Sequence, residues 1–270
     1  VQTCALPICT GGLGPVSDLL LYQVDGRVAW LTLNRPEKRN ALNGELVAAL
    51  KAGLARAADD PEVRVVALGG AGTDFCSGAD LAELERISEM GEEENLDDAR
   101  SLGALFQQMR QHPNPIVGVI RGRALAGGCG LASACDLVLA AADAEFGYPE
   151  VHLGFVPALV MTILRRKMGE GRAFEVVAQG DRFGAEEARR LGLVNQVWAS
   201  EDFEAGVDDY LRRLAKKPAS AVQLTKGLLY ELDGLDFDAG IARAAEVNVE
   251  ARMTDACRAG VRRFLDKSTD

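Results

Sequence analysis

The chain has 270 residues, of which 48% are hydrophobic and 26% charged; both fractions are typical of a globular protein with a sizeable core. Its formal net charge is −10, and an acidic surface repels phosphate backbones, so we expect no nucleic acid partner. No apolar run approaches the ~18 residues of a membrane span, and we expect no membrane partner.

Cysteine and histidine usage argues against a disulfide scaffold and a metal site. The six cysteines fit no zinc-ligand spacing, and a chain of this size does not need disulfides. We therefore expect reduced thiols and a cytoplasmic protein. The two histidines, His112 and His152, cannot alone build a metal site, and we expect no metal. The cysteines are Cys4, Cys9, Cys76, Cys129, Cys135 and Cys257.

The first fifteen residues, VQTCALPICTGGLGP, do not look like part of the fold. They contain neither a basic segment nor a continuous apolar core, so they are not a secretory signal. VQTCALPI resembles the translation of a short-read sequencing adapter. We interpret residues 1–15 as an artefactual or disordered tail and expect native sequence to begin near Val16.

Strands and helices are predicted to alternate in the first part of the chain. Residues 19–34 contain two apolar runs about an Asp25–Gly26 turn, a pattern typical of a hairpin. Asn43 is a candidate N-cap for a helix over residues 45–60. The acidic part of residues 88–113 is expected to be a mobile surface segment ahead of a helix. Further strands are predicted at 63–70 and 115–125 and within 135–155.

Helices are predicted to dominate the rest of the chain. Pro157 is a favoured first residue for the helix over 157–169. The pattern favours an α/β fold with crossovers, divided into a core at residues 16–200 and a C-terminal helical region at 201–270. The other helices are predicted at 171–178, 184–192, 201–216, 218–232 and 237–266, with a short strand at 194–198.

Four segments stand in order between residues 18 and 266: NRPEKRNALN, FCSGADL, GRALAGGCGLASACDLVLAAADAEFGYPEVHLGF and AEEARRLGLVNQV. Together they resemble the crotonase superfamily, the enoyl-CoA hydratases and isomerases. The resemblance implies a spiral of ββα units with a C-terminal helical trimerisation region. It also implies trimers, commonly paired into hexamers, and an acyl-CoA thioester that is substrate rather than cofactor.

The resemblance assigns an oxyanion hole to the turns SGAD and LAGG. Its donors would be the backbone N–H groups of Ala79 and Gly127, which hold the thioester oxygen as it becomes an enolate. The physical chemistry agrees, because fixed N–H groups at helix starts stabilise a developing anion and glycine permits close approach. The matches also place Lys38, Arg39, Ala41, Ser77, Gly78, Asp80, Leu81 and Gly128 against coenzyme A.

Some of these assignments have plainer alternatives. Lys38 and Arg39 either meet the coenzyme phosphates or form a solvated basic loop. Asp80 is expected to start a helix beside the ligand and not to act as a base.

The proton carriers depart from the family pattern. Known hydratases use two glutamates, and Glu150 in FGYPEVHLG matches one of them, whereas Gly130 stands where the other belongs. On a strand, His152 would share a face with Glu150 and could replace the missing acid, or it is merely packed. Tyr148 is a second auxiliary candidate.

Downstream, the family's glycine-rich run into GGTQRL is replaced by ALVMTILRR, with Ala158 in place of a glycine whose N–H helps orient water. Leu159, Val160 and Met161 follow it. We therefore expect a reshaped acyl pocket, measurable but poor hydration of short straight 2-enoyl-CoA, and better hydration after Gly130→Glu if the helix accepts the added side chain.

The sequence therefore predicts an enzyme of the enoyl-CoA hydratase/isomerase type that uses one glutamate as acid and base. Isomerisation between 3-enoyl-CoA and 2-enoyl-CoA, or hydratase-lyase chemistry, is an alternative. A non-catalytic acyl-CoA-binding module is the alternative of another class. Apolar positions in the C-terminal helices are expected to form the subunit contact, namely Leu211, Leu214, Leu224, Leu228 and Leu232.

Overall fold

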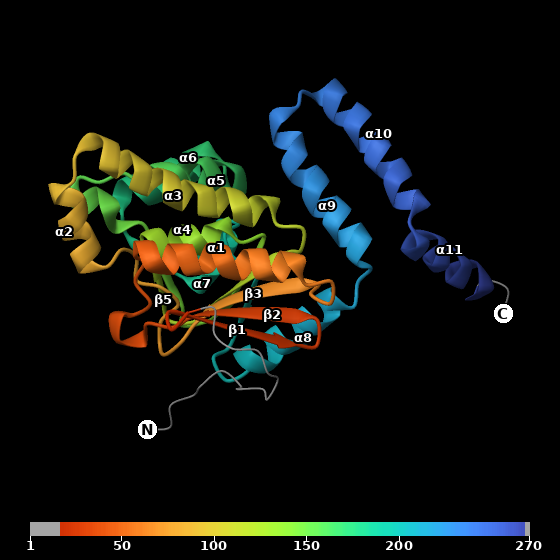
Figure 1. The fold of residues 1–270 in the computed structure, drawn as a ribbon, viewed down its shortest axis with the longest axis horizontal. Coiled ribbons are helices and arrows are strands. Elements are labelled where there is room, and N and C mark those ends of the chain that lie inside the picture. The colour runs from red at the N-terminus through yellow and green to blue at the C-terminus, as the bar shows by residue number, and fades with distance from the viewer. Residues whose placement is uncertain (1–16, 268–270) are drawn as a thin grey trace.

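The computed structural model describes residues 17–267, so the tail at residues 1–15 lies outside the described part. Two sheets organise the chain (Figure 1). The larger has the strand order β1-β2-β3-β4-β6-β9 and is parallel except for the β1–β2 hairpin, and the smaller has the order β5-β7-β8. The strands are β1 (Leu20–Asp25), β2 (Val28–Leu33), β3 (Val65–Gly70), β4 (Ile116–Ile120), β5 (Arg123–Leu125), β6 (Leu137–Ala141), β7 (Glu145–Gly147), β8 (Arg182–Gly184) and β9 (Gln196–Trp198).

The chain repeatedly passes from the larger sheet to the smaller and then into a helix. β4 and β5 lead into α4 (Gly127–Ala134), and β6 and β7 lead through η2 (Pro149–Leu153) into α5 (Ala158–Met168). This is the predicted spiral of ββα units. The remaining helices are η1 (Pro36–Lys38), α1 (Gly44–Asp59), α2 (Leu81–Glu89), α3 (Glu92–Gln111), α6 (Glu170–Gln179), α7 (Ala185–Arg190), α8 (Phe203–Ala215), α9 (Ala219–Glu231), η3 (Leu232–Gly234), α10 (Phe237–Met253) and α11 (Asp255–Lys267).

Several local predictions are confirmed. β1 and β2 pair antiparallel with Asp25 opposite Val28, and Gly26 adopts φ +60° in the turn, which favours glycine. The Asn43 side chain accepts a hydrogen bond from the Leu46 N–H at 2.9 Å and caps α1. Of the helices in the described residues, none is long and apolar enough to cross a membrane.

The acidic segment is helical, so its prediction as a mobile stretch is wrong. It forms the first turns of α3, where three glutamates lie near the positive end of the helix dipole. The Glu94 carboxylate accepts a hydrogen bond from the Gly91 N–H at 3.1 Å, and Asp98 pairs with Arg86 of α2 at 2.7 Å. Local charge pairing therefore orders a segment whose composition suggested mobility.

The predicted helix at 237–266 is in fact two helices. Thr254 is extended, with φ −69° and ψ 145°, between α10 and α11. Its hydroxyl donates to the Ala251 carbonyl at 2.8 Å and accepts from the Cys257 N–H at 3.2 Å. A threonine that bonds its neighbouring backbone in this way competes with the continuous helix.

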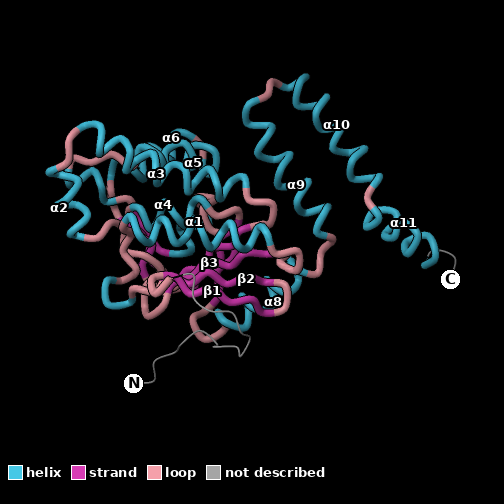
Figure 2. The backbone as a smooth tube through the Cα atoms, in the orientation of Figure 1, coloured by secondary structure: helices cyan, strands magenta, loops and turns pink. Residues whose placement is uncertain are grey.

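Helix α8 covers one face of the larger sheet, and the helices α1, α3 and α4 lie on the other (Figure 1). Leu211 is fully buried against that sheet and Leu214 packs against the same cluster. The prediction of Leu211 as a subunit-contact residue is therefore wrong, because it belongs to the core of its own chain, whereas Leu214 is partly exposed and its predicted contact stays a prediction. The part that stands apart is the arm α9–α11, which begins at Ala219 (Figure 2).

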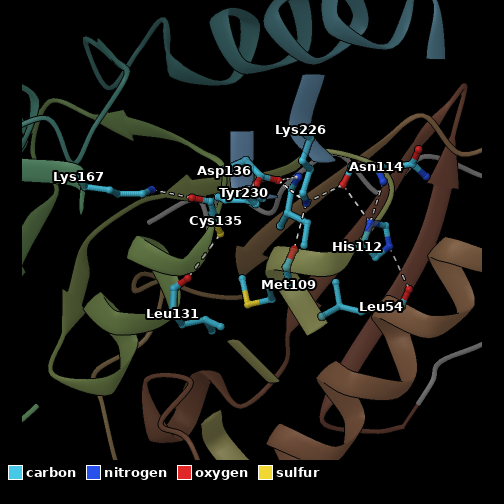
Figure 3. A network of polar contacts seen from close by, with 11 residues as sticks. Leu54, Met109, His112, Asn114, Leu131, Cys135, Asp136, Lys167, Lys226 and Tyr230 are labelled. Atoms are coloured by element: carbon cyan, nitrogen blue, oxygen red, sulfur yellow. Dashed lines mark hydrogen bonds and ion pairs between the residues drawn. The ribbon is translucent and has the colours of Figure 1, made fainter. Parts of the chain in front are cut away.

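A buried polar network attaches α9 to the body (Figure 3). The Lys226 ammonium donates to the Met109 carbonyl at 3.0 Å, to the Asn114 carbonyl at 3.1 Å and to the Asp136 carboxylate at 2.7 Å. The Tyr230 hydroxyl donates to the other oxygen of Asp136 at 2.5 Å. Asp136 follows α4 by two residues, so this network fastens the arm to the end of the helix that Gly127 begins.

Candidate active site

The turn that carries Ala79 is held by Leu42. The Leu42 N–H donates to the Gly78 carbonyl at 2.7 Å, and the Leu42 carbonyl accepts from the Asp80 N–H at 3.1 Å. Successive N–H groups of an extended chain point to opposite sides, so the Ala79 N–H points away from Leu42. Within the described residues no acceptor is bonded to it, and Ala79 itself is exposed.

The start of α4 lies directly beside this turn. A side-chain carbon at Gly78, which has φ +101°, would lie 3.7 Å from the Gly127 nitrogen and 2.9 Å from the Ala126 Cβ. A side-chain carbon at Gly127 would lie 3.3 Å from Leu42. The structure therefore brings the two predicted donor turns together around Leu42.

Strain and close packing fix the direction of the Gly127 N–H. Ala126 adopts φ 48° and ψ −126°, a conformation that costs a non-glycine residue of order 1–3 kcal/mol. Gly128 packs so tightly that a Cβ there would lie 2.3 Å from the Cys76 carbonyl oxygen. The Gly127 N–H is one of the unpaired donors at the first turn of a helix, which suits it to bind an anionic oxygen.

Sequence reasoning missed Arg35, which locks the neighbouring loop. Its guanidinium forms an ion pair with Asp80 at 2.7 Å and donates to the Ala41 carbonyl at 2.5 Å. The Arg35 hydrogen bond holds the pKa of Asp80 below its usual range, and Asp80 caps α2. Arg35 lies inside the quoted motif, but its partner is 45 residues away, so no local signal reveals the pair.

The other predicted coenzyme residues are spread around this loop. Lys38 and Arg39 are exposed, the Arg39 carbonyl accepts from the Ser77 N–H at 3.0 Å, and Ala41 is buried. Leu81 is the first residue of α2. The two basic residues thus lie at the surface beside the Ala79 turn.

Glu150 lies in η2 and is half-buried. Its Oε2 atom is buried and has no hydrogen-bond partner in the described residues, and burial raises the pKa of its carboxyl. A desolvated carboxylate with one unpaired oxygen is suited to proton transfer.

The two auxiliary candidates, Tyr148 and His152, differ in their surroundings. Tyr148 is fully buried, and its hydroxyl lies 2.5 Å from the Ser133 hydroxyl and 3.4 Å from the Cys129 carbonyl. The expectation that Glu150 and His152 share a strand face is wrong, because Pro149 opens a 3-10 turn in which residues two apart do not align. His152 is exposed, and its ring lies over Gly180.

Neighbouring side chains fill the space that the second glutamate of the family pattern would need at residue 130. A Cβ at Gly130 would lie 2.6 Å from the Val160 Cγ2 atom and 3.7 Å from the Phe106 ring. Phe106 also lines a cavity of about 810 Å³ among α3, α5 and α9. None of Ala79, Gly127 and Glu150 borders that cavity, so it lies outside the candidate site.

Comparison with known proteins identifies the family. The family model described as enoyl-CoA hydratase/isomerase matches residues 23–270, and the chain belongs to this family, within the crotonase superfamily.

A Thermus thermophilus relative, named among the enoyl-CoA hydratases, is 42% identical over 252 residues, covering 92% of this chain and 98% of its own. The crotonyl-CoA hydratase of Syntrophomonas wolfei is 33% identical, with 92% and 95% covered. An enoyl-CoA hydratase structure from Mycobacterium smegmatis superposes with a TM-score of 0.89 at 32% identity, covering 93% of this chain and 97% of its own.

Proposed function

We propose that this enzyme of the enoyl-CoA hydratase/isomerase type forms a thioester enolate, with the Ala79 and Gly127 N–H groups as oxyanion hole and Glu150 as its only carboxylate acid/base. The proposal is carried by one observation: two adjacent turns offer N–H groups with no acceptor among the described residues, and the Oε2 atom of Glu150 is buried without a hydrogen-bond partner there. A thioester α-proton is weakly acidic, so fixed donors for the enolate oxygen supply much of the catalysis. Lys38 and Arg39 are proposed to meet the coenzyme phosphates.

The proposal is tested by incubating the protein with crotonyl-CoA and with a 3-enoyl-CoA, while binding of each thioester is measured by calorimetry. We expect both to bind and at least one to turn over. Binding of both without turnover of either would favour the non-catalytic acyl-CoA module.

Turnover is expected to depend on pH through Glu150. The glutamate accepts a proton only when ionised, and burial raises its pKa, so activity should fall as the pH drops through a value above the ~4.3 of an ordinary glutamate. A pH profile of kcat/KM for the better substrate gives this midpoint. A midpoint at or below the ordinary value would contradict a desolvated Glu150.

The arm α9–α11 is proposed to mediate assembly into a trimer or hexamer. It extends from the body (Figure 1) and carries exposed apolar side chains, among them Leu229, Phe237 and Ile241, which are 61%, 81% and 58% exposed. Exposed apolar surface of this kind marks a contact site. Light scattering at micromolar concentration should show three or six subunits, and a strictly monomeric species would count against the proposal.

A further inference from the structure

We propose that Val160 is a specificity-determining residue: its side chain fills the space beside Gly130 and biases the site toward double-bond migration over hydration. The inference rests on the proposed function, because it concerns what Glu150 does when it works alone. It also names the substrate class, a 3-enoyl thioester.

The space beside Gly130 is closed by a rigid apolar wall. Val160 and Phe106 are only 4% and 8% exposed, and a Cβ at Gly130 would overlap Val160 at 2.6 Å. Valine is stiff about χ1, so it does not rotate aside easily. A side chain at residue 130 therefore requires Val160, or the helix that carries it, to move.

This wall lies close to the proposed oxyanion donor. Gly127 and Gly130 are three residues apart on α4 and share a face of the helix. The rise between them is about 4.5 Å, so Val160 lies about one helical turn from the Gly127 donor.

Polar groups that might hold a water there are engaged or point elsewhere. The Ala158 N–H donates to the Val156 carbonyl at 2.8 Å, and the Tyr148 hydroxyl is bonded inside the core. A bound water needs two to four polar partners. Neither the Ala158 N–H nor the Tyr148 hydroxyl is therefore free to hold a water beside Val160.

Double-bond migration needs no such water. Glu150 takes the proton from C2 of a 3-enoyl thioester, and the electron pair delocalises into a dienolate whose charge rests on the thioester oxygen. The same carboxyl returns the proton to C4, the C2–C3 double bond forms, and the C3–C4 double bond is lost. Hydration instead adds a water oxygen to C3 and a proton to C2.

The test compares the wild type, Val160→Ala, Gly130→Glu and the double variant, each with crotonyl-CoA and 3-hexenoyl-CoA. We expect Gly130→Glu alone to lower both activities and the Tm, because the new side chain overlaps Val160. This overlap outweighs the stabilisation that replacing a helical glycine contributes, so the better hydration expected after Gly130→Glu requires the change at Val160 as well. The double variant should raise the hydration-to-isomerisation ratio by about 10²-fold.

A second measurement does not depend on the folding of the double variant. In D2O, Val160→Ala should increase deuterium at C4 of the isomerised product several-fold, because water gains access to the protonated Glu150. Val156→Ala, an exposed position in the same segment, is the control and should leave deuterium incorporation unchanged.

The outcomes separate the two proposals. Three results would each overturn the role of Val160 in an enzyme that remains active. The double variant could fold with an unchanged hydration-to-isomerisation ratio, or Gly130→Glu alone could hydrate crotonyl-CoA as well as the double variant does. The third such result is an unaltered deuterium content in the product of Val160→Ala. A wild type that turns over neither thioester would overturn the proposed function, and this inference with it.

Discussion

Replacing Glu150 with glutamine is expected to lower turnover by about 10²–10⁴-fold while the affinity for the acyl-CoA stays nearly constant. The amide keeps the shape of the side chain but cannot accept the α-proton. Steady-state rates on the better thioester, together with calorimetric binding of the same compound, give the two quantities. Unchanged turnover would remove Glu150 from the mechanism.

A measurement of folding stability shows whether the lost turnover of Glu150→Gln comes from the missing proton carrier or from misfolding. Burial raises the pKa of Glu150 in the folded chain, so the folded state favours the protonated carboxyl. The contribution of this protonation to the free energy of unfolding is complete below the unfolded pKa and is lost as the pH rises through the folded pKa. Glu150→Gln should therefore match the wild type in acid and be at least as stable at neutral pH. Glu145→Gln, an exposed residue on β7, is the matched control and should leave turnover intact.

Replacing Lys226 with methionine is expected to destabilise the fold by about 3–5 kcal/mol, the range for breaking a buried ion pair. The Lys226 and Asp136 side chains are only 7% and 14% exposed, and methionine fills the volume but leaves the carboxylate without its cation. Tyr230 keeps one hydrogen bond to that carboxylate, which does not replace the charge. Urea unfolding at fixed protein concentration measures the difference.

Two further variants show whether the destabilisation by Lys226→Met comes from the broken ion pair. Lys217→Met changes an exposed lysine and should shift the urea midpoint by little. Asp136→Asn combined with Lys226→Met should cost less than the sum of the single changes, because no unpaired charge remains. Additive costs in this cycle would show that the ion pair does not hold α9 in place.

The sequence predicts most of the fold because local rules govern most of its elements. The hairpin follows from Asp25–Gly26 and the start of α1 from Asn43, and both need only neighbouring residues. Thr254 was missed because apolar periodicity continues across it, while its hydroxyl ends one helix and caps the next. Composition predicts mobility at the acidic start of α3, but the Glu94 carboxylate accepts from the Gly91 N–H and Asp98 pairs with Arg86 of α2, contacts that composition does not reveal.

Some residues of the candidate site can likewise be predicted from the sequence, and others cannot. Gly127, Ala79 and Glu150 were identifiable from motif order, and the structure shows the first two side by side. The sequence shows Val160 only as a bulky residue, because its closeness to Gly130 joins two helices 30 positions apart. His152 lies in a 3-10 turn and not on the predicted strand, because Pro149 opens that turn. Contacts between distant segments require the fold itself.

The central claim is that the two N–H donors and Glu150 together generate an enolate. Butyryl-CoA, a saturated thioester that can neither be hydrated nor isomerised, tests it most directly when incubated in D2O and followed by NMR at C2. We predict that the wild type exchanges the α-protons for deuterium, and that Glu150→Gln binds the thioester without exchange. Exchange that persists in the variant, or that never occurs in the wild type, would contradict the account.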